Sequence, residues 1–375
     1  MSAYEVVRYR SDLRHEVGAL QRHLWGGDEA ANIAYLEWKY ERNPYVSTPM
    51  VYLAVHDGRV VGMRGLYGSC WEIGPRAERF LIPCADDFVI APEHRNHGVF
   101  GLIMSAVRGD LAAQGQRIAF SLSAGPTTLA GSLAGGWRSP SSVREVGRRS
   151  AATSRWLGLA RRMRRLPIVW RWADMVPERR RRSGAAQFRR LDGRARRAPD
   201  GGRVWLSRTP DVDAMAELVG RLGHDGRARQ VRDARYLSWR FANPQHEYRF
   251  LYAGRASLDG YLVLQAYRRQ NRPGVNIVDW EAATPASRAA LLRAAVAWGG
   301  DADLSAWTIS LPEAARALLA EAGFAPAQRG RLMREGPRLL VWVIDGRAGG
   351  EPVLAERRLL DVSSWDMRML YSMAG

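Results

Sequence analysis

A short aromatic segment occurs twice in this chain of 375 residues, and the repeat limits the possible folds more than any other feature of the sequence. The first copy reads Tyr-Leu-Glu-Trp-Lys-Tyr-Glu-Arg-Asn-Pro at 35–44, and the second reads Tyr-Leu-Ser-Trp-Arg-Phe-Ala-Asn-Pro at 236–244. After each copy, apolar stretches flank an Asp-Gly pair, which predicts a β-hairpin over 50–62 and another over 248–263. Self-similarity of this kind predicts two domains of common ancestry.

Each predicted hairpin is followed by alternating strand and helix patterns. We expect strands at 85–90 and 117–122 around a helix at 99–114, and later strands at 275–280, 304–310 and 338–344 alternating with helices at 286–298 and 313–322. This alternation predicts an α/β fold with mixed sheets. The expected division is a first domain at 1–150, a linker at 151–198 and a second domain at 199–375.

The chain carries a formal net charge of +18, although its 46% of hydrophobic residues is ordinary for a soluble globular protein. Of the 56 basic residues all are arginine except Lys39. Eighteen arginines and four acids lie between Arg144 and Arg197, so this stretch holds +14 of the net charge. Such a concentration of positive charge predicts an anionic partner.

The only cysteines, Cys70 and Cys84, have no spacing typical of a metal site or a disulfide framework, and they indicate a reducing, cytoplasmic setting. The N-terminus lacks the apolar core of a secretory signal. The sequence contains no run of about 18 apolar residues, the length needed to span a bilayer. We therefore expect any membrane contact to be peripheral, at the inner face of the plasma membrane.

Residues 91–101, Ala-Pro-Glu-His-Arg-Asn-His-Gly-Val-Phe-Gly, connect an expected strand to an expected helix. A glycine turn in this position presents unpaired backbone N–H groups and the positive end of the helix dipole. Gly98 lets the backbone approach a phosphate, and Arg95 can add a charge-assisted contact. The segment is therefore a candidate pyrophosphate site, although it matches neither the dinucleotide fingerprint nor the phosphate loop.

The order hairpin, strand, Arg-x-x-Gly turn, helix, strand, helix and Gly-Trp resembles the GNAT superfamily of acyl-CoA-dependent N-acyltransferases. In that family an Arg/Gln-x-x-Gly-x-Gly/Ala turn holds the pyrophosphate of coenzyme A. Arg95 and Gly98 match, whereas Phe100 stands where the family has a small residue. The second copy reads Glu-Ala-Ala-Thr-Pro-Ala-Ser-Arg at 281–288, so the resemblance implies a degenerate second domain without coenzyme binding.

The resemblance implies acyl-CoA as a co-substrate, an amine as acceptor, no permanently bound cofactor and no metal. It assigns coenzyme binding to the turn, to the backbone of the preceding strand and to hydroxyls of the next strand: Val89, Ile90, Arg95, Asn96, His97, Gly98, Val99, Phe100, Gly101, Ser121 and Ser123. The backbone of the preceding strand, at 89–91, is also where the family stabilises the oxyanion.

Acylation of an amine needs a base to remove a proton. Asp86 and Asp87 begin the strand before the turn, and alternation along a strand sends them to opposite faces. We expect Asp87 to face the cleft as the base, with a hydrogen bond to a neighbouring loop as the competing interpretation. His94 is the second catalytic candidate, and exposure without a role is its alternative. Thr128 is a poor substitute for the tyrosine that many relatives use as the acid.

The linker contains a basic amphipathic segment at 155–173. In a helix, Trp156, Leu159 and Met163 would lie opposite four arginines at 161–165, until Pro167 interrupts the pattern. Basic amphipathic helices with tryptophan bind anionic membrane surfaces, so residues 155–182 are a candidate membrane contact. The alternative explanation of the same pattern is a helix that packs its apolar face between the two domains. Nucleic-acid binding is disfavoured because no recognised binding motif accompanies the charge, and the sequence does not indicate an oligomeric state.

Together these features predict transfer of an acyl group from acyl-CoA to a primary amine. A lipid amine such as a sphingoid base, as in bacterial ceramide synthase-like proteins, is the first expectation for the acceptor. An amino sugar or another small amine of envelope or secondary metabolism is the second. A non-enzymatic, GNAT-like scaffold that binds a ligand is the remaining alternative.

Overall fold

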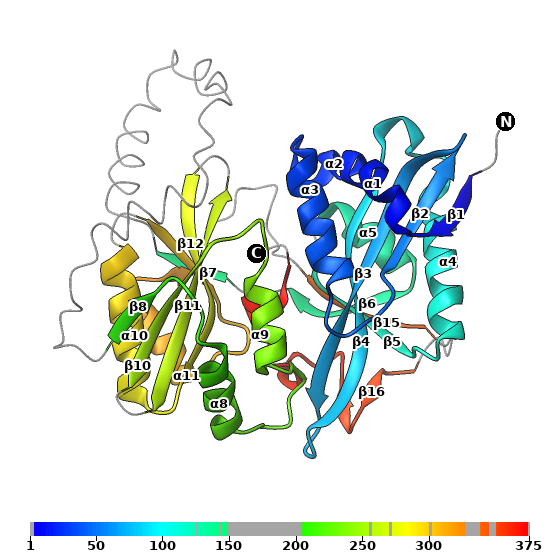
Figure 1. Ribbon diagram of the computed structural model, residues 1–375. Coiled ribbons are helices and arrows are strands. Elements are labelled where there is room, and N and C mark those ends of the chain that lie inside the picture. Colours follow the sequence, from blue (N-terminus) through cyan, green and yellow to red (C-terminus); the bar gives the residue numbers. More distant parts are fainter. Residues whose placement is uncertain are drawn as a thin grey trace, which may run out of the picture.

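The computed structural model describes residues 4–124, 126–142, 145–148, 204–254, 257–269, 272–299, 302–326, 338–344 and 350–373. Two mixed β-sheets lie side by side with helices against both, so the predicted α/β fold class is confirmed (Figure 1). The predicted linker, with its basic amphipathic segment, lies outside the described residues. Among the residues described, no helix is long and apolar enough to cross a membrane.

The elements of the first half follow the predicted order. They are β1 (Glu5–Arg8), α1 (Arg14–Leu20), α2 (Arg22–Trp25), α3 (Glu29–Leu36), a π-helical turn η2 (Glu37–Glu41), β2 (Met50–His56), β3 (Arg59–Ile73), β4 (Glu78–Ile90), α4 (Val99–Ala113), β5 (Ile118–Ala124), α5 (Pro126–Ala134), β6 (Trp137–Ser142) and β7 (Glu145–Arg148). The predicted strand at 85–90 is the second part of the longer β4, which forms a hairpin with β3.

The second half repeats this order. Its elements are β8 (Val204–Ser207), α8 (Val212–Leu222), β9 (Arg229–Gln230), α9 (Ala234–Phe241), β10 (Tyr248–Gly254), β11 (Leu258–Arg269), β12 (Arg272–Ala282), α10 (Pro285–Gly299), β13 (Asp303–Trp307), α11 (Glu313–Glu321), β14 (Ala325–Pro326) and β15 (Arg338–Val343). A C-terminal segment follows, with β16 (Val353–Leu354), β17 (Arg357–Arg358), and the 3-10 turns η6 (Val362–Ser364) and η7 (Met369–Tyr371).

Strands cross between the two halves: the short β9 of the second half pairs with β3, and one longer strand of each half joins the sheet of the other. The first sheet has the order β1-β2-β3-β4-β5-β15-β6, and the second has the order β14-β7-β13-β12-β11-β10-β8. Strand β15 of the second half is thus inserted between β5 and β6, while β7 of the first half is inserted between β13 and β14 (Figure 1). The predicted boundaries at 150 and 199 therefore divide both sheets, because sequence patterns identify strands but not their distant pairing partners.

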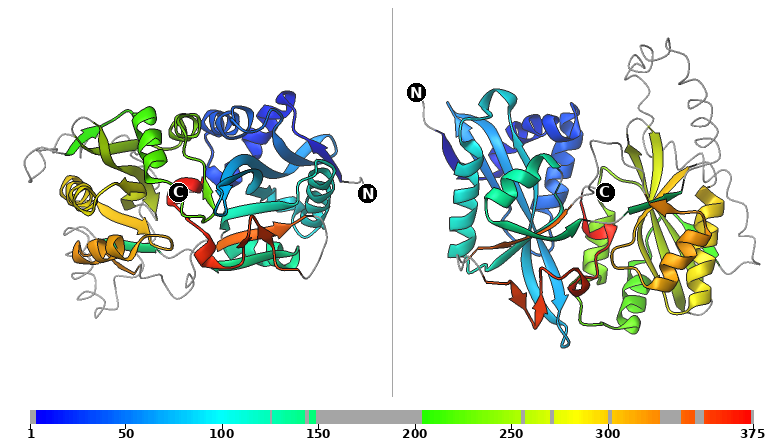
Figure 2. Two further views of the ribbon diagram at one scale, coloured as in Figure 1. Left: turned by 90° about the horizontal axis from the view of Figure 1, so that it is seen from below. Right: turned by 180° about the vertical axis from the view of Figure 1, so that it is seen from behind.

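Apolar side chains fill three clusters, so the molecule is layered (Figure 2). One cluster lies between the first sheet and α4, and another lies between the second sheet and α10. The largest lies between the two sheets and contains residues from α1, α3, α8, α9 and the C-terminal segment. The two faces of the first sheet are therefore distinct, with α4 on one side and α3 on the other. We call them the α4 face and the α3 face.

The repeated aromatic segments meet at the centre of the molecule. The indole rings of Trp38 and Trp239 stack with centroids 5.0 Å apart and planes 14° apart. Trp38 Nε1 donates to the carbonyl of Trp239 at 2.6 Å, and Trp239 Nε1 donates to the carbonyl of Trp38 at 2.9 Å. Tyr35, Trp38 and Tyr40 of the first copy are all buried.

Candidate functional site

The predicted anion-binding turn leads from β4 into α4. It passes through a 3-10 turn at Pro92–His94 and two left-handed positions, Asn96 with φ of 64° and Gly98 with φ of 76°. Gly98 caps α4 without a side-chain hydrogen bond, and the first helical turn contains no acidic residue. Leu102 donates its N–H to the carbonyl of Gly98, so the N–H groups of residues 99–101 have no acceptor within the helix.

The turn is open on its outer side. Arg95, Asn96, His97 and Gly98 are exposed, and a Cβ placed on Gly98 would meet no atom within 4 Å. The Arg95 Nε donates to the carbonyl of Ile90 at 3.1 Å, which fixes the side chain beside the end of β4. The turn therefore combines free backbone donors, a helix N-terminus and a nearby cation, as the sequence predicted for an anion site.

Strands β4 and β5 diverge next to this turn. Among the described residues, Cys84 and Phe120 form their one register pair, whereas β4 pairs with β3 along its whole length. Ala91 donates its N–H to the carbonyl of Val61 in β3. Because backbone groups alternate in direction along a strand, the N–H of Ile90 faces away from β3, toward β5. The predicted backbone donors of this strand thus border a gap between β4 and β5.

Phe100 does not cover the open side of the turn. Its ring is half-buried and lies edge-on against the Phe88 ring of β4, with centroids 5.1 Å apart. On its other side it contacts α5, where a Cβ on Gly131 would lie 3.2 Å from the ring. Phe100 therefore joins α4, β4 and α5 on the α4 face. The side chain of Val99 packs in the core, so only its backbone faces the turn.

Asp86 and Asp87 lie on the same face of the sheet, which corrects the prediction from strand alternation. A β-bulge interrupts the strand here, with Arg64 paired to Phe88, Gly65 paired to Asp86, and Asp87 left over at φ of 45°. The extra residue turns both carboxylates toward the α3 face, since a bulge places two residues opposite one.

Both carboxylates bind Lys39, the only lysine of the chain. Its Nζ lies 2.8 Å from Asp86 Oδ2 and 2.9 Å from Asp87 Oδ2, and Tyr40 donates its hydroxyl to Asp87 at 2.7 Å. The side chain of Asp87 is fully buried, and that burial raises its pKa despite Lys39. The side chain of Asp86 is 19% exposed. The geometry therefore argues against Asp87 as a base and leaves Asp86 as the accessible carboxylate of the cluster.

His94 faces away from the gap. Its Nδ1 lies 3.0 Å from the hydroxyl of Tyr4, and its ring is 5.1 Å from that of His56 at the end of β2. The structure thus places the second catalytic candidate at the outer edge of the sheet, where it supports the turn. Ser121 is buried in β5, on the opposite face from its neighbours Phe120 and Leu122 and hence on the α4 face. Ser123 follows in β5, and its side chain lies outside the described residues.

The equivalent place in the second half is filled by groups of the chain itself. Thr284 accepts the N–H of Ser287 with its hydroxyl, and Arg288 donates to the carbonyls at the end of β12. Arg368 of the C-terminal segment adds ion pairs to Asp279 and Glu281 of β12. These contacts occupy carbonyl and carboxylate groups at the end of β12.

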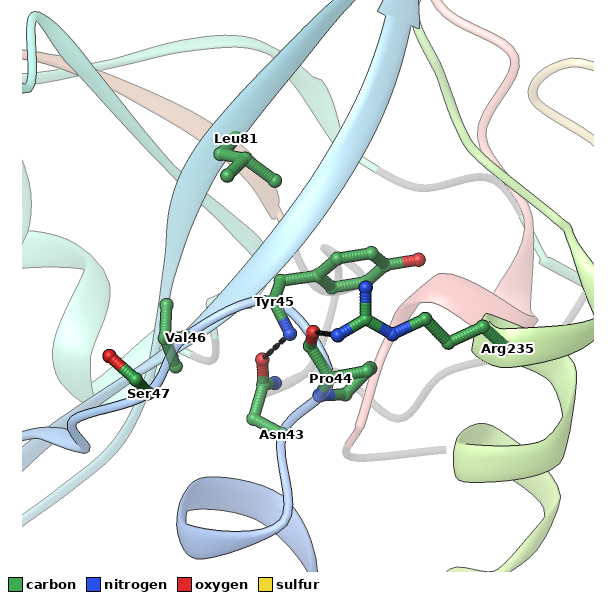
Figure 3. Close-up of a pocket in the computed structure, with 7 residues that line it drawn as sticks. All are labelled: Asn43, Pro44, Tyr45, Val46, Ser47, Leu81 and Arg235. Carbon is green, nitrogen blue, oxygen red and sulfur yellow. Dashed lines mark hydrogen bonds between the residues drawn. The ribbon is translucent and has the colours of Figure 1, made fainter.

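A separate cavity of about 480 Å³ lies at the opposite end of β4 (Figure 3). The loop at 43–47, exposed Leu81 and Arg235 of α9 line it. The Arg235 guanidinium lies over the Tyr45 ring, 5.7 Å from its centroid, and donates to the carbonyl of Pro44. Because α9 belongs to the second half, this cavity is on the seam between the halves and apart from the turn.

The sequence prediction missed Lys39 as a member of the site. Its signal was present, since a lone lysine among 55 arginines indicates a position where arginine is not equivalent. The structure gives the reason. The ammonium fits a fully buried space between two carboxylates and the hydroxyl of Tyr35, where the larger planar guanidinium would not.

No family model matches the sequence, and no curated protein matches it. Solved structures match the fold. A GCN5-related N-acetyltransferase from Anabaena variabilis ATCC 29413 aligns over 91% of this chain and 73% of its own, with a TM-score of 0.57 and 13% identity. A conserved protein of unknown function from Enterococcus faecalis V583, described as a probable N-acyltransferase, aligns over 92% and 73%, with a TM-score of 0.59 and 12% identity.

A GCN5-related N-acetyltransferase from Kribbella flavida aligns over 92% of this chain and 72% of its own, with a TM-score of 0.54 and 16% identity. Because about nine tenths of the chain is covered in each alignment, the likeness includes both halves. The chain therefore shares the fold of these GCN5-related N-acetyltransferase structures over both of its halves.

Proposed function

We propose that the first half binds an acyl-CoA at the turn before α4 and transfers its acyl group to a primary amine. The observation that carries this proposal is the position of the turn, whose free N–H groups and Gly98 lie directly beside the gap between β4 and β5. A pyrophosphate at the turn would direct the pantetheine arm into the gap, along the N–H of Ile90. The similar structures, described as GCN5-related N-acetyltransferases and a probable N-acyltransferase, and the sequence motif both favour this chemistry.

The two faces of the sheet suit the two substrates. The turn and Ser121 are on the α4 face, where the anionic donor would enter. Asp86 is on the α3 face with Lys39, where a cationic amine would approach. In this arrangement Asp86, held by Lys39, accepts the proton of the attacking amine, and the N–H of Ile90 stabilises the oxyanion. The proposal thus assigns the base to Asp86 in place of Asp87.

Gly98→Glu is expected to abolish binding of coenzyme A. The substitution places a carboxylate at a left-handed position in front of the helix N-terminus, where it repels the pyrophosphate and fills its space. Titration calorimetry with coenzyme A measures the loss. Gly115→Glu is the matched control, because Gly115 follows α4 at its other end with φ of 73° and equally open surroundings. Equal affinity in both variants would contradict a pyrophosphate site at the turn.

Asp86→Asn is expected to lower kcat by about 10²–10⁴-fold, the usual contribution of a general base, while coenzyme A binding stays unchanged. Thiol release from acyl-CoA in the presence of a primary amine measures turnover. Glu217→Gln removes an exposed carboxylate of α8 and serves as the control. Full turnover by Asp86→Asn would show that Asp86 is not the base.

We further propose that the acceptor is a lipid amine, such as a sphingoid base, met at the cytoplasmic face of the membrane. The basic amphipathic sequence at 155–173 supports this, and it lies outside the described residues. An amino sugar fits the same acyl transfer without a membrane contact. Turnover with a long-chain amine and with glucosamine separates these acceptors.

Co-sedimentation with anionic liposomes tests the membrane contact. We expect binding at low salt that is lost at high salt, because exposed charges are screened within a few ångströms there. Replacing Arg161, Arg162, Arg164 and Arg165 with glutamine should release the protein from the liposomes. Neutral liposomes are the control, and absence of co-sedimentation at low salt would contradict a lipid acceptor at the membrane.

A ligand-binding scaffold without activity is the second candidate. The ring of Phe100 beside the gap and the buried ion pair of Asp87 favour it. Calorimetry with coenzyme A and acyl-CoA is the first measurement, because absence of binding by the wild type would contradict the enzyme. Binding without turnover in any acceptor panel would favour the scaffold, and binding with turnover would exclude it.

A further inference from the structure

Arg64 of β3 is a buried cation without an oxygen partner. The residue is 7% exposed, its Nε is fully enclosed, and no carboxylate or carbonyl among the described residues accepts a hydrogen bond from its guanidinium. Its guanidinium lies over the Phe88 ring, 5.8 Å from Cζ to the centroid. Burial lowers its pKa. A buried charge without a hydrogen-bonded counter-charge is costly and is retained where a ligand supplies the partner.

The other buried arginines of the described residues differ in this respect. Arg232 pairs with Asp279 and Glu281, and Arg240 donates to two carbonyls of the C-terminal segment. Arg249 donates to the carbonyl of Tyr248. Each of these guanidinium groups has oxygen acceptors, as expected for buried arginine. Arg64 is therefore an exception among the buried arginines that the structure describes.

The side chain of Arg64 lies on the α4 face and extends toward the gap. Gly62 and Arg64 share one face because they are two residues apart, and a Cβ on Gly62 would meet Val99 and Ile103 of α4. The guanidinium lies over Phe88, which belongs to the next strand and borders the gap. Through Phe88 it thus lies next to β4, the strand that borders the gap.

Charges of opposite sign are separated across the sheet at this level. Lys39, Asp86 and Asp87 together leave one net negative charge on the α3 face, and Arg64 carries a positive charge on the α4 face. The two carboxylates act on Arg64 electrostatically across the sheet and do not contact it. The planar guanidinium on the α4 face matches a planar anionic group such as a carboxylate, since arginine binds carboxylates through two parallel hydrogen bonds.

We propose that Arg64 binds a carboxylate of a substrate in the gap between β4 and β5. The inference rests on the proposed function in that it takes the gap as the substrate cleft. A carboxylate reaches this position from two sources, an acyl-CoA whose acyl group ends in a carboxylate or an acceptor that carries a carboxylate beside its amine. The position of Arg64 on the α4 face, with the turn, favours the acyl donor.

Stability of Arg64→Met gives the first test. Methionine replaces the aliphatic part of arginine and has no charge, so the free variant should unfold at the same temperature as the wild type or a higher one, because no ion pair is lost. Arg232→Met is the matched control and should unfold at a much lower temperature, since it leaves Asp279 and Glu281 without their partner. Equal destabilisation of both variants would show that Arg64 has a structural partner and would overturn the inference.

Calorimetry with matched probes gives the second test. Succinyl-CoA and butyryl-CoA have acyl chains of equal length, and phenylalanine and phenethylamine differ by one carboxylate. We expect at least one pair to show a tenfold or greater preference for the carboxylate, lost in Arg64→Met and reduced in Arg64→Lys. The acyl-CoA pair identifies the donor as the source, and the amine pair, measured with coenzyme A present, identifies the acceptor.

The outcomes separate this inference from the proposed function. Binding of phenylalanine with an Arg64-dependent preference, but no binding of either acyl-CoA, would reject acyl transfer and keep the carboxylate site. Binding of both acyl-CoA probes without a preference in either pair would keep the proposed function and overturn the inference. A preference that survives in Arg64→Met, or the absence of binding by all four probes, would also overturn it.

Discussion

Replacing Trp239 with alanine should lower the free energy of unfolding by about 3–5 kcal/mol, the usual cost of deleting a buried tryptophan side chain. Trp239 is 8% exposed and stacks on Trp38, which is 2% exposed. Because these rings join the two halves, their loss opens the contact between the sheets as well as a cavity. The change also leaves the carbonyl of Trp38 without its donor. Urea denaturation followed by tryptophan fluorescence or circular dichroism measures the effect.

Trp205→Ala is the matched control for this prediction. Trp205 is 48% exposed at the end of the second sheet, so its replacement should cost about 1 kcal/mol or less. The double variant Trp38→Ala with Trp239→Ala adds a further check. Since the two residues share their contacts, the effects should be strongly non-additive. Additive effects would show that the two tryptophans stabilise the protein independently and do not act as a joint between the halves.

Lys39→Met should also cost about 3–5 kcal/mol at neutral pH, because removing one member of a buried ion pair leaves the other charge uncompensated. The Nζ of Lys39 is the cation that contacts both Asp86 and Asp87. Without it the fully buried Asp87 keeps only the hydroxyl of Tyr40 as a donor. Urea denaturation at pH 7 measures the loss, and Asp87→Asn in the Lys39→Met background should recover most of it.

The loss of stability in Lys39→Met should decrease as the pH falls. Burial already raises the pKa of Asp87 in the native protein, and removal of Lys39 raises it further. The folded variant therefore binds a proton more tightly than the unfolded chain, whose aspartates titrate near pH about 3.9. Stability contributed by protonated Asp87 is present at low pH and is lost as the pH rises toward the raised pKa. A difference from wild type that stays constant between pH 7 and 4.5 would contradict this assignment.

The anion-binding turn could be predicted because its signals are local. The Arg-x-x-Gly spacing, the apolar strand before it and the helical periodicity after it all lie within one short segment, and Gly98 has the left-handed conformation that glycine favours. Both hairpins and the long helices α4 and α10 were predicted for the same reason. These features depend on residues close together in sequence.

The catalytic candidates could not be predicted in the same way. Asp87 lies on the same face as Asp86 because a bulge adds one residue to β4, and nothing in the alternating pattern of 83–90 indicates that bulge. His94 faces Tyr4 because the turn passes over the end of β2. Phe100 contacts α5 and leaves the turn open. This orientation of the ring needs the space left by Gly131, which is thirty-one positions away.

The sequence by itself determined the repeat, the order of strands and helices, and the position of a glycine turn at a helix N-terminus. Only the tertiary structure decided that β7 and β15 change sheets, that Lys39 binds two carboxylates, and that Arg64 has no oxygen partner in the part of the chain that the structure describes. The physical reason is the distance along the sequence over which each effect acts. Periodicity and backbone preference act between near neighbours, whereas strand pairing and the compensation of buried charge depend on which distant surfaces meet.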